Sequence, residues 1–162
     1  MTPSVQSQTP YVRWLARISI LLLLAQSAYV TGWAFVDIMV RLGVWPRSTE
    51  GWDAYSFFAS LSFWQEAAFF SSTLLALVSV WLHWRRSFWV LPVYFLSYLL
   101  YRLDSFLLTL NSLFNGIAGV ETFAPMLILQ LALLLALILL WGEGYFDQDR
   151  FRFWRKGPPA DR

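Results

Sequence analysis

Long apolar stretches separated by short polar segments dominate the pattern of this sequence. The apolar stretches cover residues 18–36, 67–84, 87–110 and 122–142. A bilayer core about 30 Å thick requires roughly 20 apolar residues in helical form. Lipid offers no partners to the backbone, so each crossing segment must close its own hydrogen bonds as a helix. The pattern therefore predicts an all-α integral membrane protein with four transmembrane helices, at about 14–43, 58–84, 88–111 and 122–142.

Composition supports this fold class and excludes several others. The chain of 162 residues is 58% hydrophobic and only 14% charged, whereas a soluble domain is about 25% charged. We expect one membrane domain spanning residues 1–162. With no cysteine and a single histidine, the chain is not expected to hold a structural zinc ion, a disulfide framework or a histidine-ligated haem. The first apolar stretch is longer than the roughly 7–15 residues typical of a signal peptide, so we expect it to remain as a helix.

The distribution of basic residues predicts the orientation of the four helices. If both termini lie in the cytoplasm, nine basic residues flank the inner side and only two flank the outer side. This bias matches the excess of Lys and Arg in cytoplasmic segments of membrane proteins. We therefore expect an antiparallel bundle in a bacterial cytoplasmic (inner) membrane. The inner residues are Arg13, Arg17, Arg85, Arg86, Arg150, Arg152, Arg155, Lys156 and Arg162, and the outer ones are Arg41 and Arg47.

An aromatic segment lies between the first two predicted spans, at residues 52–64. Pro46 and Gly51 interrupt helices before it, and Asp53 can cap a new one. The segment is either a helix or long loop in the outer headgroup plane or the beginning of a long, tilted second span.

The C-terminal tail, residues 143–162, alternates aromatic and basic residues. Such a tail next to a transmembrane helix suits anionic headgroups, and each basic residue contributes about 1 kcal/mol near the surface. We expect it to bind membrane lipids rather than nucleic acid. The predicted lipid-anchoring residues are Arg150, Arg152, Trp154, Arg155 and Lys156.

Several polar residues fall at membrane depth, where ionisable groups seldom remain unpaired. Arg102 lies sixteen residues past Arg86, or about 24 Å along a helix. The same outer half contains Asp37, Glu66 and Gln130.

We expect Arg102 to pair with Glu66, Asp37 or both, because one guanidinium can bridge two carboxylates. Gln130 and Gln65 would complete the hydrogen bonds. Asp104 lies about 200° around the helix from Arg102, so those two cannot pair on one face. The network either locks the order of the helices or forms a proton, ion or anion site. Its predicted members are Asp37, Glu66, Arg102, Gln130, Gln65 and Asp104.

Sequence motifs for common enzymes are missing from the chain. It contains no glycine-rich phosphate loop, GxSxG elbow or HExxH motif, which ATP hydrolysis, serine hydrolysis and zinc proteolysis require. We therefore expect no catalytic residues, no metal site and no cofactor.

Three functions remain open. The first is a non-catalytic subunit that scaffolds or anchors a larger inner-membrane complex with other integral membrane subunits. The second is a small carrier or channel formed by self-association. The third is an intramembrane enzyme that uses Asp37 and Glu66 as general acid and base. In size and topology the chain is similar to the small membrane subunits of tripartite periplasmic transporters, with Trp64-Gln65-Glu66 at the head of the second span as the local similarity. That resemblance implies the first function.

Overall fold

Four long helices form most of the protein. The computed structural model describes residues 9–46, 48–49, 52–111 and 124–146. Four of its helices are long and apolar enough to cross a membrane, as expected for a multi-pass membrane protein. The elements are α1 (Pro10–Arg41), β1 (Ser48–Thr49), β2 (Trp52–Asp53), α2 (Ala54–Ala59), α3 (Phe63–Trp84), α4 (Val90–Thr109) and α6 (Ala124–Gly142).

Helix ends are set by local hydrogen bonds. α1 begins with Pro10, whose missing N–H costs nothing in a first turn. It ends in a Schellman motif, in which the amide of Gly43 donates to Val40 O and the amide of Val44 donates to Met39 O. Gly43 has φ 72°, a left-handed conformation that glycine adopts without strain.

The second membrane helix starts later than residue 58, where the sequence pattern placed it. The side chain of Ser62 accepts a hydrogen bond from the amide of Gln65 at 3.3 Å and so caps α3 at Phe63. The preceding residues form α2, a separate helix, instead of lengthening α3. Asp53 caps α2 by accepting from the amide of Ser56 at 3.0 Å.

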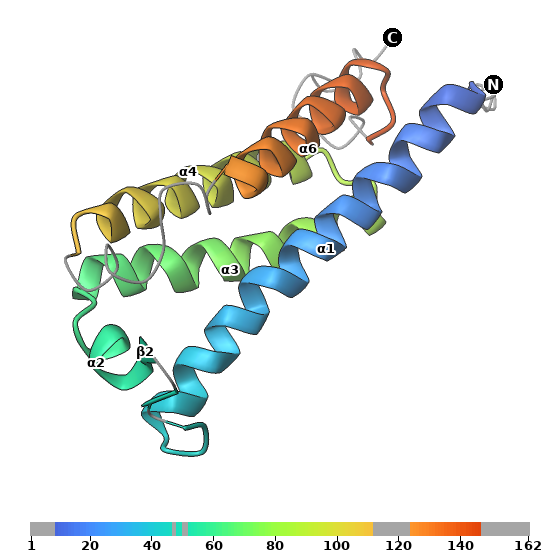
Figure 1. Cartoon of the computed structure of the whole chain (residues 1–162). Helices are drawn as coiled ribbons and strands as arrows, with labels where there is room; N and C mark the ends of the chain where they lie inside the picture. The colour runs from blue at the N-terminus through green and yellow to red at the C-terminus, as the bar shows by residue number, and fades with distance from the viewer. Residues whose placement is uncertain (1–8, 47, 50–51, 112–123, 147–162) are drawn as a thin grey trace, which may run out of the picture.

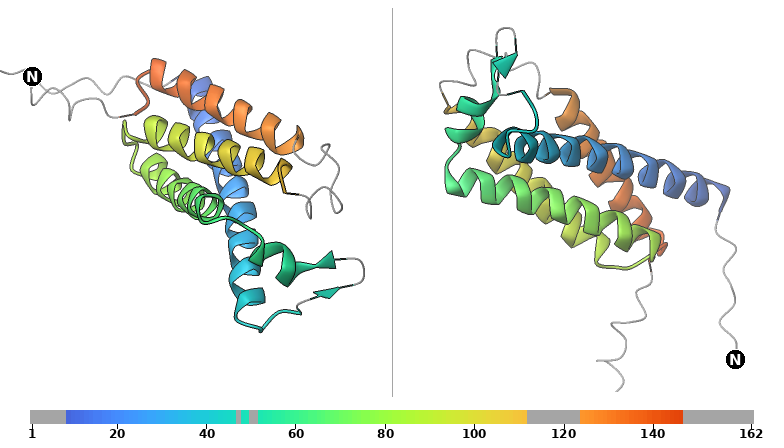
Figure 2. Two further views of the ribbon diagram at one scale, coloured as in Figure 1. Left: turned by 90° about the vertical axis from the view of Figure 1, so that its left-hand side faces the viewer. Right: turned by 90° about the horizontal axis from the view of Figure 1, so that it is seen from below.

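α3 and α4 lie side by side, and α1 crosses this pair and α6 at an oblique angle (Figures 1 and 2). The largest apolar core lies where the first half of α1 meets the other long helices. Near its C-terminal end α1 diverges from α3, and α2 fills the space between them. The buried side chains of the main core are Val12, Ala16, Leu23, Leu82, Val90, Tyr94, Leu133, Leu137, Leu140 and Phe146.

A second apolar cluster anchors α2. Val40 of α1 contacts Ala54 and Phe58 of α2, and all three side chains are buried. The outward faces of the four long helices carry mainly large apolar side chains, and the exposed charges of α1 lie toward its two ends, at Arg13, Arg17 and Arg41. Such faces suit hydrocarbon, which supports the assignment of these helices to a membrane.

Candidate functional site

Three charged residues meet where α1, α2 and α3 converge. Arg41 Nε lies 2.6 Å from Asp37 Oδ1, and Arg41 Nη2 lies 2.6 Å from Glu66 Oε1. The same Nη2 donates to the backbone oxygen of Phe58 at 2.8 Å. One guanidinium therefore links a carboxylate on α1, a carboxylate on α3 and the backbone of α2. We call Asp37, Arg41 and Glu66 the charged cluster.

The charged cluster is unevenly buried. The side chain of Asp37 is 2% exposed, while those of Glu66 and Arg41 are 29% and 39% exposed. Arg41 ends α1 and Glu66 lies in the first turn of α3, so the cluster is at one end of the helices and not at mid-depth. A buried carboxylate requires a partner to offset the loss of water. Arg41 provides that partner to Asp37 while keeping part of its own side chain exposed.

The cation in this cluster differs from the one that the sequence analysis proposed. Asp37 and Glu66 come together as expected, but Arg41 bridges them, and Arg102 instead donates to Gln130. The prediction was wrong because Arg41 was counted only as a basic residue flanking the outer side and was not considered as a partner for the carboxylates. The spacing of Asp37 and Arg41 was the missed signal, since residues at i and i+4 share one face of a helix.

A second, mostly uncharged cluster joins α1, α4 and α6. The hydroxyl of Tyr94 donates to Gln26 Oε1 at 2.8 Å and lies 3.4 Å from the backbone oxygen of Gln130. Arg102 Nη2 donates to Gln130 Oε1 at 2.6 Å. Gln26, Tyr94 and Gln130 are almost completely buried. We call these four residues the central amide cluster.

Aromatic rings help to hold the charge of Arg102. Its guanidinium carbon lies 5.8 Å from the centroid of the Tyr98 ring and 5.1 Å from that of Tyr101. Both distances fall in the range of cation–π attraction. An amide oxygen and two rings thus take the role that a carboxylate was predicted to play. Within the described residues, Arg102 Nε and Gln130 Nε2 are buried without a hydrogen-bond partner.

Two other predicted members lie outside both clusters. Gln65 is buried, but its Nε2 has no hydrogen-bond partner among the residues that the structure describes. It therefore does not complete the charged cluster, although it is next to Glu66 in the chain. Asp104 is also buried and faces the helix group. Sequence reasoning missed Gln26 and Tyr94, because a lone amide and a lone phenol within apolar runs do not reveal which helices will meet.

A buried contact between Ser19 and His83 fixes how α1 and α3 are aligned. Ser19 Oγ lies 2.8 Å from His83 Nε2 and also donates to the backbone oxygen of Ala16 at 3.0 Å. Which of the two groups donates in the first contact depends on which ring nitrogen of His83 carries the proton. The contact places residue 19 of α1 level with residue 83 of α3.

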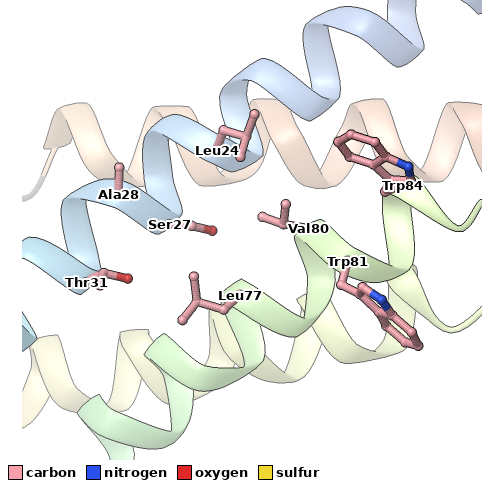
Figure 3. A pocket seen from close by; sticks show the side chains of 8 residues that line it. All are labelled: Leu24, Ser27, Ala28, Thr31, Leu77, Val80, Trp81 and Trp84. Atoms are coloured by element: carbon pink, nitrogen blue, oxygen red, sulfur yellow. The ribbon is translucent and has the colours of Figure 1, made fainter.

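An open groove of about 490 Å³ runs between α1 and α3 (Figure 3). Its walls are mostly apolar, with hydroxyl groups contributed by α1. The lining residues are Leu24, Ser27, Ala28, Thr31, Leu77, Val80, Trp81 and Trp84.

Within the described residues, no group of three or more His, Cys, Asp or Glu side chains is placed to hold a metal ion. The predicted lipid-anchoring residues lie outside the part of the chain that the structure describes. They are Arg150, Arg152, Trp154, Arg155 and Lys156.

Comparison with known proteins assigns no family to this chain. No family model matches it, and no curated protein or solved structure matches it. The function is therefore inferred from the contacts described above.

Proposed function

We propose that this protein is a non-catalytic integral membrane subunit that scaffolds or anchors a larger complex of the bacterial inner membrane, such as a transporter. One observation carries the proposal. The polar side chains of both clusters are engaged in contacts between helices of this chain, as Arg41 is with Asp37 and Glu66. Polar side chains in such contacts stabilise the order in which the helices pack.

The proposed topology places both termini in the cytoplasm and has successive long helices cross in opposite directions. The bias of basic residues toward one side supports this orientation. The charged cluster then lies toward the outer surface, and α2 lies in the outer headgroup region. Tyr55 of α2 is exposed, and aromatic side chains of this type favour membrane interfaces.

A partner surface is proposed at the same end of the molecule. Exposed aromatic side chains gather near α2 and the start of α3, and they include Trp45, Tyr55, Phe63 and Trp64. Aromatic residues are enriched in the buried centres of protein interfaces. We call these four residues the aromatic face and propose that it contacts another membrane subunit.

The two other hypotheses have less support from the geometry. A small oligomeric carrier requires a polar path, whereas the groove between α1 and α3 has mostly apolar walls. An intramembrane enzyme requires acidic groups available to a substrate. Asp37 and Glu66 are both hydrogen-bonded to Arg41.

Site-specific photocrosslinking in the native membrane tests the proposal. A photoreactive residue replaces Trp64, whose side chain is among the most exposed at 74%. We expect a crosslink to a different membrane protein, identified by mass spectrometry after extraction in a mild detergent.

The matched control replaces Leu135 of α6, which is also exposed, at 57%, but lies outside the aromatic face. It should crosslink much less to that protein. A crosslink from position 64 only to a second copy of this chain would favour the carrier instead. Equal crosslinking from both positions would contradict a specific partner surface.

A further inference from the structure

We propose that the groove between α1 and α3 binds an anionic phospholipid, with one acyl chain in the groove and the phosphate held by Arg17 and Arg85 at its open end. This site is independent of the aromatic face and of the proposed subunit role.

The groove has a direction, with its two indoles together at one end. Trp81 and Trp84 stand at that end, and Thr31 marks the other (Figure 3). Between them, aliphatic side chains of the two helices form the walls. Tryptophan favours the level of lipid headgroups, so the end with Trp81 and Trp84 is the end that meets headgroups.

A cation is in direct contact with this end of the groove. Arg85 follows Trp84, the last residue of α3, and it is exposed. Its guanidinium carbon lies 5.5 Å from the centroid of the Trp81 ring, which lines the groove. Arg85 is therefore placed where a phosphate above a bound acyl chain would lie.

A second cation reaches the same end from α1. Arg17 is exposed and precedes the groove residue Leu24 by seven positions, so the two share one face of the helix. The contact of 2.8 Å between Ser19 Oγ and His83 Nε2 shows which residues of α1 and α3 lie at the same height. Arg17 lies two residues before Ser19 and Arg85 lies two residues after His83. Both arginines are thus at the same end of the groove.

These features fit a phospholipid better than another helix. A helix is about 10–12 Å across with a 5.4 Å pitch, so the groove of about 490 Å³ has room for only about one turn. A single extended hydrocarbon chain fits such a space along its length. Two arginines at the open end match the charge of a phosphate, and basic pockets between transmembrane helices are known to bind anionic headgroups.

The neighbouring Arg86 provides a natural comparison. It adopts φ 50° in the turn after α3, and its guanidinium carbon lies 5.0 Å from the centroid of the Tyr145 ring, beyond the end of α6. Arg85 and Arg86 thus carry the same charge on adjacent residues, but only Arg85 contacts a groove residue. Lipid binding in the groove should therefore depend on Arg85 and not on Arg86. Lipid binding to a diffuse basic surface would depend on both arginines equally.

Native mass spectrometry of the full chain in mild detergent tests the proposal. The protein is mixed with dioleoyl phosphatidylglycerol or with dioleoyl phosphatidylcholine, which has the same chains and no net charge. We expect one retained molecule of phosphatidylglycerol and weaker retention of phosphatidylcholine. Arg85→Gln should weaken binding of phosphatidylglycerol about fivefold, and Arg86→Gln should leave it nearly unchanged.

A second pair of variants tests the position of the acyl chain. Ala28 lines the groove, so Ala28→Leu should fill it and reduce retention of both lipids. Ala25 is exposed on α1 but does not line the groove, so Ala25→Leu is the matched control and should retain lipid like the unmodified protein.

Several results would overturn the site. Equal losses in Arg85→Gln and Arg86→Gln would indicate a diffuse basic surface, and equal retention of the two lipids would exclude headgroup selection. Unchanged binding in Ala28→Leu would place the acyl chain elsewhere. A dimer that Ala28→Leu dissociates, without retained lipid, would show that a helix of a second copy occupies the groove.

Discussion

The two polar clusters hold helices together by different means. In the charged cluster, one cation joins two carboxylates at the end of α1 and α3, and part of it reaches the surface. In the central amide cluster, an amide and a phenol pair deep among apolar side chains. The charged cluster offers stronger individual bonds and carries a larger penalty if a partner is lost. Burying the central amide cluster costs less free energy, and removing one of its hydrogen bonds lowers the stability of the protein less.

Position in the bilayer explains this division. Charges are costly at mid-depth and much less so near the interface. The two carboxylates accordingly lie at the helix ends, while the buried centre uses Gln26, Tyr94 and Gln130. Arg102 of α4 is charged as well, and two tyrosine rings and an amide oxygen lie against its guanidinium.

The largest expected effect comes from removing the cation of the charged cluster. Arg41→Gln leaves the nearly fully buried carboxylate of Asp37 without its partner, and we expect a loss of about 3–5 kcal/mol in the free energy of unfolding. Unfolding in mixed micelles, followed by tryptophan fluorescence, measures this loss. The double variant Arg41→Gln with Asp37→Asn should recover most of the stability. A loss below about 1 kcal/mol in the single variant, typical of a surface pair, would remove the contrast between the clusters.

A smaller effect is expected in the central amide cluster. Tyr94→Phe deletes the hydroxyl that donates to Gln26 Oε1. Hydrogen bonds between membrane helices contribute about 0.6 kcal/mol on average and at most about 1.7 kcal/mol, so the loss in unfolding free energy should lie in that range. Tyr98→Phe is the matched control, because Tyr98 contacts Arg102 through its ring. A loss equal to that of Arg41→Gln would show that the two clusters do not differ in kind.

The smallest expected effect concerns the cap of α2, beside the charged cluster. Hydrogen bonds from the side chain and amide of Ser56 lower the pKa of Asp53 below its ordinary value. A lowered pKa in the folded protein means that the cap stabilises α2 above the pKa of the unfolded state, and that this contribution is lost as pH falls through the folded pKa.

Hydrogen exchange at the amide of Ser56, corrected for intrinsic rates, measures the loss of the cap. Protection should fall at acidic pH in the unmodified protein. Asp53→Asn should be nearly independent of pH, because asparagine also caps helices but does not titrate. The same acid dependence in both proteins would assign it to the charged cluster instead.

The sequence predicted some of these features and missed others for identifiable reasons. The four apolar runs are sufficient to predict four candidate membrane helices, because hydrocarbon permits few alternatives. The charges of Asp37 and Glu66 identified them as residues in need of a partner. The pattern did not show where α3 begins, because a cap at Ser62 depends on one side-chain hydrogen bond.

Tertiary structure alone decided which polar groups meet. Arg41 and Arg102 were both available to the carboxylates, and the oblique crossing of α1 over α3 brought Arg41 to Glu66 while α6 brought Gln130 to Arg102. The groove between α1 and α3 likewise depends on how those two helices cross. Apolar length is a property of each segment and can be read one helix at a time. The angles and rotations that select partners depend on the side chains of all the helices together, and no single segment specifies them.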